Sequence, residues 1–441
     1  MKTVRIGCGA GYSGDRLDPA LELAEKGDLD YLVFECLAER TIALAQLRRL
    51  SNPGHGYDPL LEERWRAVLP VCFKNGTRII TNMGAANPEA AARITVAIAQ
   101  ELGLSGLKVA RVQGDDVLPL ILGGPNRWTG AAHEFIVSAN AYLGAGPIRQ
   151  ALGMGADVVL TGRTSDPALF LAPLLHEFGW RDDDWAILGQ GTVIGHLLEC
   201  AGQITGGYFA DPASNKNVPG LARLGFPLAE VQENGAATIT KVAGSGGIIT
   251  RHTCMEQLLY EVQDPAAYIT PDVIADFSSV TLEEMAADCV RVSGARGRPA
   301  PSDLKVSVGY RNGFLGEGQI SYAGAGVLAR ARLAQEILEE RLKPADLAEL
   351  ECTIIGINSI HGPALSPVPQ QEPYEVRLRV AGRARTLAAA KRIFREVEAL
   401  YTNGPAGGGG ATGFAREMIT MDSLLLPRFL VHTQVSLEVV P

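Results

Sequence analysis

The stretch VRIGCGAGYSGDRLDPALELAEK (residues 4–26) combines a short β-branched run, a glycine-rich loop and an alanine- and leucine-rich run. A strand, a loop and a helix in this order open a βα unit. The same alternation of short β-branched runs and longer alanine- and leucine-rich runs continues through the first 180 residues. The sequence therefore predicts an α/β fold with a mostly parallel sheet and flanking helices, doubly wound and Rossmann-like.

The alternation predicts five strands and five helices in this region. The predicted strands cover residues 4–7, 30–35, 78–82, 107–112 and 157–161. The predicted helices cover residues 19–26, 38–50, 60–75, 88–102 and 166–178. Three of the helices begin with a capping side chain followed by proline, at Asp18-Pro19, Asn87-Pro88 and Asp166-Pro167, which supports the alternation.

Beyond residue 189 the pattern loosens. It predicts helices at 192–200, 253–262 and 326–342, a strand at 237–241 and a strand pair at 305–310 and 319–322. The last part, with strands at 350–358, 374–380 and 429–439 and a helix at 386–401, is typical of a small C-terminal α+β module. With a boundary near Lys343-Pro344, the expected domains are residues 1–345, which could divide again near 185–250, and residues 346–441.

Composition limits the classes of function. The chain has 441 residues, a formal charge of −9 and a pI near 5.4, which argue against a nucleic-acid surface. It contains no run of the roughly 18 apolar residues that span a bilayer, and its start enters a strand rather than a signal peptide. We expect a cytoplasmic protein with no membrane or nucleic-acid partner, whose seven scattered cysteines are reduced.

The opening loop has the spacing of a dinucleotide fingerprint. Three glycines fit G-x-G-x-x-G, namely Gly9, Gly11 and Gly14, and Glu35 falls close to the position of a ribose-binding acid. The helix starts late, however, at Asp18-Pro19, and Asp15 would repel a pyrophosphate. We interpret the loop as one wall of a small-molecule pocket, and keep an NAD(P)-dependent oxidoreductase as the less favoured alternative.

Polar side chains follow the predicted strands, at the edge of a parallel sheet where ligands bind. They are Asp15, Glu35, Glu39, Arg40, Asn82, Asn87, Gln113, Asp115, Asp116, Arg163 and Asp166. Helix capping is the alternative role for Asn87 and Asp166. Arg163 lies on a short loop after an apolar strand, where a guanidinium could bind a carboxylate or phosphate in bidentate fashion.

Two further groups could carry chemistry. His196, Glu199 and Cys200 share one helix face and suggest a His–Glu general acid/base pair, with a zinc site or a plain polar face as alternatives. Lys241, Ser245 and Gly246 belong to a glycine-rich segment with an anion-binding composition, or form a tight strand-to-helix turn. The glycine-rich segment has no P-loop ending, and Ser245 has no G-x-S-x-G frame.

Taken together, these stretches resemble the acyclic terpene utilisation (AtuA-like) family. The resemblance rests on IG and GDR (residues 6–7 and 14–16), LDYLVFE and LAERT (29–35 and 37–41), TNMGAANP (81–88), TGR and DPAL (161–163 and 166–169), HLLEC and QITGGYF (196–200 and 203–209), Lys241 with GSGG (244–247), and LYTNGPAGGGG (400–410). It implies bacterial catabolism of branched acyclic isoprenoids, whose intermediates are carried as branched acyl-CoA thioesters. It supplies no catalytic residue.

We therefore expect a lyase or hydratase that acts on a branched hydroxyacyl thioester or a related hydroxy-carboxylate. Arg163 and Lys241 would hold the anionic group, and Glu35, Asp115 or the His196–Glu199 pair would move the proton. No cofactor is required, although a divalent metal could bind at clustered carboxylates. A non-catalytic, acyl-binding partner subunit is a further alternative, and a homo-oligomer is expected.

Overall fold

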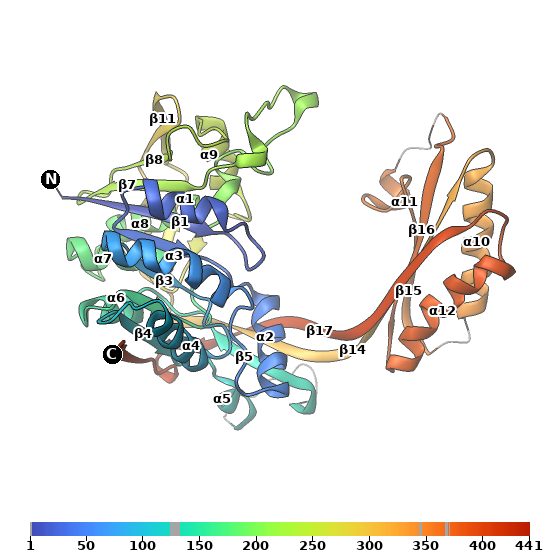
Figure 1. Cartoon of the computed structure of the whole chain (residues 1–441), viewed down its shortest axis with the longest axis horizontal. Helices are drawn as coiled ribbons and strands as arrows, with labels where there is room; N and C mark the ends of the chain where they lie inside the picture. Colours follow the sequence, from blue (N-terminus) through green and yellow to red (C-terminus); the bar gives the residue numbers. More distant parts are fainter. Residues whose placement is uncertain (1, 124–132, 344–345, 367–368, 370) are drawn as a thin grey trace. The chain divides into compact units, whose positions relative to one another are not determined.

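The computed structural model describes residues 2–123, 133–343, 346–366, 369 and 371–441 (Figure 1). The chain divides into two compact units. Unit 1 contains Met1–Gly309 and Met421–Pro441, and unit 2 contains Tyr310–Thr420. The chain therefore leaves unit 1 after Gly309 and returns to it at Met421.

Unit 1 is built on a mixed sheet of ten described strands. Five parallel strands form its middle, in the order β1 (Thr3–Ala10), β2 (Tyr31–Phe34), β3 (Arg78–Thr81), β6 (Val158–Leu160) and β4 (Lys108–Gln113). Antiparallel strands continue the sheet beyond β1, in the order β7 (Pro227–Gln232), β8 (Ala237–Lys241), β12 (Cys289–Ser293) and β11 (Thr281–Ala286). On the other side, β18 (Gln434–Val439) pairs antiparallel with β4.

The α/β class is confirmed, but the sheet is mixed rather than mostly parallel. The doubly wound, Rossmann-like arrangement is not confirmed. In that arrangement β1 would have parallel strands on both sides, whereas here its second neighbour is the antiparallel strand β7. Beside β1 the sheet therefore lacks the pair of parallel strands between which the doubly wound fold binds a dinucleotide.

Two sets of helices pack against the strands of unit 1. One set is α1 (Asp18–Lys26), α3 (Leu61–Asn75) and α4 (Pro88–Glu101), and the other is α6 (Gly146–Gly153), α7 (Ala168–Phe178) and α8 (Trp185–Leu198). The remaining helices of the described part of this unit are α2 (Glu39–Ser51), α5 (Leu118–Gly123) and α9 (Arg251–Leu259). Helices α7 and α8 are apolar and buried almost all round, as expected of helices enclosed between layers.

All five strands and five helices predicted for the first 180 residues are present, with ends that differ by at most one or two residues, except that β1 ends three residues later than predicted. At the first helix Asp18 is a helical residue and Leu17 occupies the cap position, so the predicted cap is wrong by one residue. The late helix start itself is confirmed.

Short elements complete unit 1. Strands β9 (Tyr268–Ile269), β10 (Ile274–Asp276) and β13 (Arg296–Arg298) form a separate sheet, and β5 (Ile136–Ala141) pairs with β14. Single-turn helices lie at η1 (His133–Phe135), η2 (Ala201–Gln203), η3 (Pro212–Ser214), η4 (Leu221–Arg223) and η5 (Arg428–Leu430).

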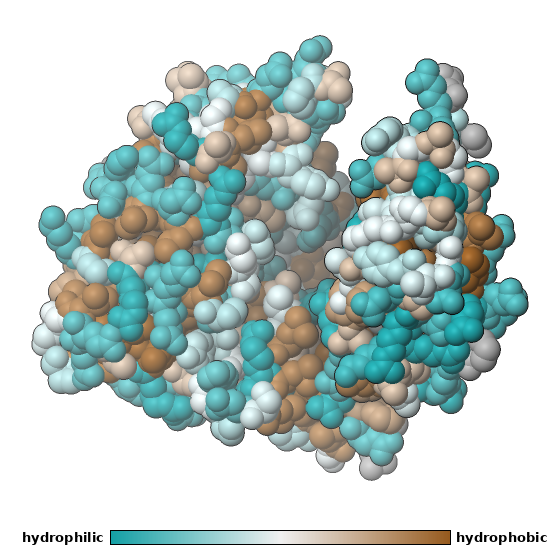
Figure 2. Space-filling model, turned by 45° about the vertical axis from the view of Figure 1, so that its right-hand side comes forward, coloured by the Kyte–Doolittle hydropathy of each residue, from teal (hydrophilic) through white to brown (hydrophobic). Residues whose placement is uncertain are grey.

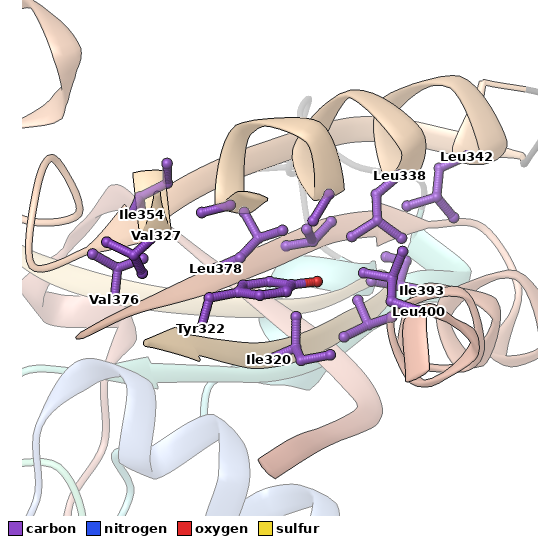
Figure 3. Close-up of a cluster of buried hydrophobic side chains, with 14 residues drawn as sticks. Ile320, Tyr322, Val327, Leu338, Leu342, Ile354, Val376, Leu378, Ile393 and Leu400 are labelled. Atoms are coloured by element: carbon purple, nitrogen blue, oxygen red, sulfur yellow. The ribbon is translucent and has the colours of Figure 1, made fainter. Parts of the chain in front are cut away.

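Unit 2 has the succession β-α-β-β-α-β. Its elements are β14 (Asp303–Ala323), α10 (Val327–Leu342), β15 (Leu347–Ile355), the short α11 (Gly362–Leu365), β16 (Glu375–Ala384), α12 (Leu387–Asn403) and β17 (Gly409–Pro427). The sheet order β15-β16-β14-β17 is that of a ferredoxin-like unit. Figure 3 shows side chains from the strands and from the helices meeting in one apolar layer, which includes Tyr322, Leu338, Leu378 and Ile393.

Two predictions for the second half of the chain are wrong. The strand pair at 305–310 and 319–322 is one long strand, β14, because its glycines interrupt the apolar pattern without ending the ladder with β16. The strand predicted at 429–439 does not join the C-terminal module but supplies β18 to the large sheet. The division into residues 1–345 and 346–441 stays a prediction, and residues 344–345 lie outside the described residues.

Hydrophilic residues cover much of the face drawn in Figure 2, with hydrophobic residues between them. Within the described ranges, no helix has the length and apolarity needed to cross a membrane.

Candidate functional site

A cavity of about 1040 Å³, which we call the central cavity, lies within unit 1. Its walls come from the start of α2, the loops after β5 and β6, the end of α8, and the parts of β14 and β17 that belong to unit 1. Its polar lining residues include Glu39, Arg40, Tyr142, Arg163, Asp166, His196, Glu199, Glu261, Asp303 and Lys305. The cavity thus brings together six residues predicted from separate parts of the sequence: Glu39, Arg40, Arg163, Asp166, His196 and Glu199.

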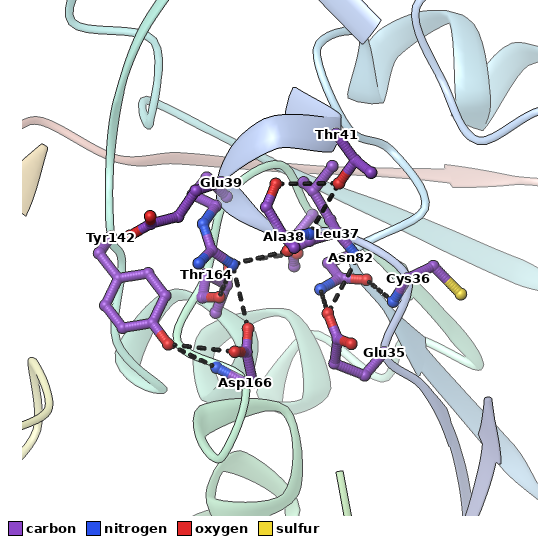
Figure 4. Close-up of polar contacts among 12 residues, drawn as sticks. Glu35, Cys36, Leu37, Ala38, Glu39, Thr41, Asn82, Tyr142, Thr164 and Asp166 are labelled. Atoms are coloured by element: carbon purple, nitrogen blue, oxygen red, sulfur yellow. Dashed lines mark hydrogen bonds and ion pairs between the residues drawn. The ribbon is translucent and has the colours of Figure 1, made fainter. Parts of the chain in front are cut away.

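Arg163 forms the centre of a polar cluster at one end of the cavity. Its Nη1 donates to the carbonyl of Leu37 (2.6 Å) and to Oδ1 of Asp166 (3.0 Å), and its guanidinium lies 4.5 Å from the centre of the Tyr142 ring. The Tyr142 hydroxyl donates to the other oxygen of Asp166 (3.3 Å; Figure 4). Nε of Arg163 is buried without a hydrogen-bond partner among the described residues, so this cation keeps an unused donor.

Asp115 fixes the backbone of the loop that carries Arg163. Its carboxylate accepts hydrogen bonds from the amide of Arg163 (2.9 Å) and from Nδ2 of Asn140 (2.8 Å). Gly162 permits this contact, because a Cβ there would lie 2.5 Å from the carboxylate oxygens. Burial raises the pKa of Asp115 to about 6, although both hydrogen bonds act in the opposite direction. Asp115 lines a small neighbouring cavity of about 210 Å³ instead of the central one.

Glu35 and Asn82 hold the turn that follows β2. Oε1 of Glu35 accepts from the amide of Leu37 and from Nδ2 of Asn82, both at 2.9 Å, and Oδ1 of Asn82 accepts from the amide of Cys36 (2.6 Å; Figure 4). Burial, together with the nearby charge of Asp166, raises the pKa of Glu35 to about 8. Glu35 therefore keeps its proton at neutral pH and stabilises the turn beneath Arg163.

His196 and Glu199 form a buried pair. Nδ1 of His196 lies 2.9 Å from Oε1 of Glu199, and Nε2 lies 3.2 Å from the carbonyl of Leu258. Because a carbonyl only accepts, Nε2 carries a proton and Nδ1 of the neutral ring is an acceptor. Burial lowers the pKa of His196 to about 4 and raises the pKa of Glu199 well above its usual range.

Glu199 therefore carries the proton of this pair and donates it to Nδ1 of His196. Its second oxygen, Oε2, is buried without a hydrogen-bond partner in the described part of the chain. A protonated carboxyl group with a tuned pKa on a cavity wall is the form in which enzymes present a general acid.

The glycine loop after β1 lines a different cavity, of about 610 Å³. Asp15 accepts from the amides of Gly11 and Arg16, both at 2.9 Å. A Cβ on Gly11 would lie 2.6 Å from the backbone of Cys200, so the loop closes tightly on η2. Because the Asp15 carboxylate already occupies amides that a pyrophosphate would need, this geometry speaks against a dinucleotide site.

The remaining predicted residues do not line the central cavity. Nζ of Lys241 donates to the carbonyl of Ser245 (2.9 Å) and pairs with Asp288 (3.1 Å), and the amide of Gly246 donates to the carbonyl of Arg223 (2.8 Å). These bonds form the tight turn that was the alternative role of this segment. Asn87 caps α4 by accepting from the amide of Ala90 (3.2 Å).

No group of three or more His, Cys, Asp or Glu side chains in the described ranges is arranged to hold a metal ion. His196, Glu199 and Cys200 are therefore not arranged as a metal site. Their arrangement fits an acid/base pair better than a zinc site.

Sequence reasoning missed several residues of the cavity, among them Tyr142, Tyr268 and Lys305. Tyr142 directly follows β5. The run IVSANA of this strand contains β-branched residues, but the predicted alternation did not include it as a strand. The Tyr268 ring lies 5.0 Å from the His196 ring, and Lys305 pairs with Glu39 (2.5 Å). Both come from the region after the βα units, where no local pattern marks a site.

Comparison with known protein families identifies a match over nearly the whole chain. The family described as "Acyclic terpene utilisation family protein AtuA" matches residues 4–437, a range that spans both units. None of the curated proteins matches the chain, and no solved structure does.

Proposed function

Because the chain belongs to the acyclic terpene utilisation family AtuA, we propose that it is a catabolic enzyme for a branched substrate. The proposed substrate is a branched hydroxyacyl thioester or a related hydroxy-carboxylate, and the proposed reaction is the removal or addition of water, or a related lyase step. Family membership supports a role in terpene utilisation, and the cavity residues support the chemistry.

One observation carries this proposal. Two buried polar atoms without partners, Nε of Arg163 and Oε2 of Glu199, belong to side chains that line the same cavity. The first is a donor on a fixed cation, and the second belongs to a protonated acid. A hydratase needs both, a group that stabilises the negative charge on a carbonyl and a group that moves a proton.

The contacts support the following roles. Arg163, supported by Tyr142, binds and polarises the carbonyl beside the reacting carbon. Asp166, whose oxygens face Arg163 and Tyr142, takes the proton from that carbon. Glu199 gives its proton to the hydroxyl on the neighbouring carbon, the C–O bond breaks, and water leaves as the double bond forms. Exchange with solvent returns a proton to Glu199 and removes one from Asp166.

Apolar side chains on another part of the wall suit the branched portion of the substrate. Ile269 and Leu425 line the cavity and yet are 64% and 68% exposed. Covering a side chain of this size is worth about 1.5–3 kcal/mol when it becomes fully buried. A branched hydrocarbon chain would cover both.

The experiment is a turnover screen. Purified protein is incubated with branched hydroxyacyl thioesters and hydroxy acids, and gain or loss of water is followed by mass spectrometry. For a substrate found in this way, Glu199→Gln should reduce kcat by at least about 100-fold, since it removes the transferable proton, while binding changes little. Arg163→Ala should weaken binding, whereas Arg181→Ala, an arginine 77% exposed outside the cavity, should not.

Two results would contradict the proposal. Binding of these compounds without any turnover would favour a non-catalytic acyl-binding subunit. Tight binding of NAD(P)H in a fluorescence titration would favour the oxidoreductase instead.

A further inference from the structure

Tyr268 presents an unused hydrogen-bond donor to the central cavity. It lies on β9, the edge strand of the small sheet β13-β10-β9, and its side chain lines the cavity. Its hydroxyl has no hydrogen-bond partner among the described residues. Tyr142, which lines the same cavity, differs in this respect, because its hydroxyl donates to the carboxylate of Asp166 (3.3 Å) and accepts from the amide of Asp166 (3.2 Å).

Two aromatic side chains hold the ring of Tyr268 in place. Its centre lies 5.0 Å from the centre of the His196 ring and 4.9 Å from that of Phe277, against which it stacks with 29° between the ring planes. His196 and Phe277 are both buried. A phenylalanine at position 268 would make the same ring contacts, so packing alone does not account for the hydroxyl.

The hydroxyl of Tyr268 needs a partner that the described residues do not supply. The side chain is half-buried, and a hydroxyl that is removed from water without a new partner costs free energy. Burial raises the pKa of Tyr268 well above its ordinary value, and the nearby Glu199, Tyr142 and Asp166 act in the same direction. The hydroxyl therefore keeps its proton at neutral pH and stays a donor.

The charges around Tyr268 favour a neutral acceptor oxygen. Asp166 and Glu261 line the same cavity, and a further carboxylate beside them would be repelled. A hydroxyl or carbonyl oxygen accepts a hydrogen bond without adding charge. In the proposed substrate the carbonyl lies at Arg163, so the hydroxyl is the neutral oxygen that remains for Tyr268.

We propose that Tyr268 donates a hydrogen bond to the hydroxyl oxygen of the substrate and so selects hydroxylated substrates. This inference rests on the proposed function, in which Glu199 gives its proton to the same oxygen. As that proton is transferred and the C–O bond breaks, Tyr268 keeps its own proton and stays bonded to the departing water. Tyr268 is thus a residue that determines specificity and not a second acid.

The test uses two acids that differ by one hydroxyl, 3-hydroxy-3-methylbutyrate and 3-methylbutyrate, in calorimetric titrations of the full-length protein. We expect the wild type to bind the hydroxy acid about three- to tenfold more tightly, the effect of one hydrogen bond between neutral groups. Tyr268→Phe removes the hydroxyl and keeps the ring. It should lose most of this preference, while its affinity for 3-methylbutyrate stays that of the wild type.

Tyr374→Phe is the matched control, because Tyr374 is 79% exposed and is not among the residues that line the central cavity. It should bind both acids as the wild type does. The Tm of both variants should stay at or above that of the wild type, since neither substitution removes a ring or a hydrogen bond between described residues. A variant that melts as the wild type does cannot have lost binding by unfolding.

Kinetics distinguish a binding group from an acid. For a substrate found in the turnover screen, Tyr268→Phe should raise KM about three- to tenfold and change kcat little, because the hydrogen bond exists before and during the reaction. The pH dependence of kcat should keep its wild-type shape. A large fall in kcat with a changed pH profile would instead make Tyr268 a general acid and overturn the inference.

Three binding results would also overturn it: failure of the hydroxy acid to bind, equal affinity of the wild type for the two acids, or an unchanged preference in Tyr268→Phe. Failure of this inference is separable from failure of the proposed function. Turnover that Tyr268→Phe leaves unaffected would refute the hydroxyl site and leave the reaction standing. Binding of the hydroxy acid that depends on Tyr268, without turnover of any hydroxy compound, would refute the reaction and leave the hydroxyl site standing.

Discussion

At the scale of single residues, Glu35 makes the free energy of unfolding depend on pH. It is a buried carboxyl group held by the amide of Leu37 and the side chain of Asn82, and its pKa is raised from 4.5 to about 8. The unfolded chain releases this proton near pH 4.5, whereas the folded protein keeps it until about pH 8. Between these values the folded state binds more protons, so the free energy of unfolding falls as pH rises, by at most about 1.4 kcal/mol per pH unit.

Glu35→Gln should remove this pH-dependent fall in the free energy of unfolding. The amide oxygen can still accept from Leu37 and Asn82, but the side chain no longer titrates. We compare urea unfolding at about pH 6 and pH 8. Between these two values, the free energy of unfolding of the wild type should fall by up to about 3 kcal/mol more than that of the variant. Glu25→Gln, an exposed glutamate on α1, is the control and should follow the wild type. Parallel pH curves for the wild type and Glu35→Gln would contradict this account.

The residues of the site differ in how far the sequence could predict them. Arg163, Asp166, His196 and Glu199 were predicted because each chemical type stood at a strand end or on one helix face, and the fold brings all four to one cavity. Lys241 lies in an equally suggestive sequence pattern, but its ammonium group forms an ion pair with Asp288. The sequence pattern cannot distinguish these cases, because the partner that pairs with a cation lies far away in the chain.

At the scale of elements, the glycine loop after β1 is a packing device. Gly11 allows it to touch the backbone of Cys200, and Asp15 caps its amides. Arg64 of α3 also binds this loop, because its Nη2 donates to the carbonyl of Ser13 (2.8 Å). The loop therefore helps to place η2, which directly follows Glu199 and Cys200.

Gly11→Ala should destabilise the protein by about 1–3 kcal/mol, because its Cβ would overlap backbone atoms that cannot move independently. Gly146→Ala is the matched control. Gly146 is the first residue of α6 and has open space around its Cβ position, so alanine there should be neutral or slightly stabilising. Denaturant unfolding measures both. Equal stability of the two variants would show that the loop is not in tight contact with η2.

The sequence predicted elements well where each was a complete, local βα unit, and less well where strands pair across long distances. Strand β14 was predicted as two strands because Gly313, Gly316 and Gly318 interrupt its apolar pattern, yet Gly316 and Gly318 are the positions against which α12 packs. Strand β18 was predicted correctly as a strand, but its partner β4 lies more than 300 residues earlier. Local periodicity contains no information about such a partner.

At the scale of the whole molecule, unit 2 is an insertion into unit 1. The chain leaves and re-enters unit 1 at neighbouring positions, since a Cβ on Gly309 would lie 3.4 Å from Sδ of Met421. Each unit has buried apolar residues of its own, and the described residues that line the central cavity all belong to unit 1. An insertion whose ends meet can be removed without stretching the chain that remains.

We therefore expect unit 1 to fold when residues 310–420 are replaced by a short glycine-rich linker. A chain ending at residue 345 follows the domain division predicted from the sequence. We expect it to unfold at a lower temperature and less cooperatively than the linked chain. It lacks β18, which completes the edge of the large sheet beside β4, and it leaves β14 without β16. Cooperative thermal unfolding compares the two chains. Cooperative unfolding of the chain 1–345 together with failure of the linked chain would show that the sequence-based boundary, and not the insertion, is the true division.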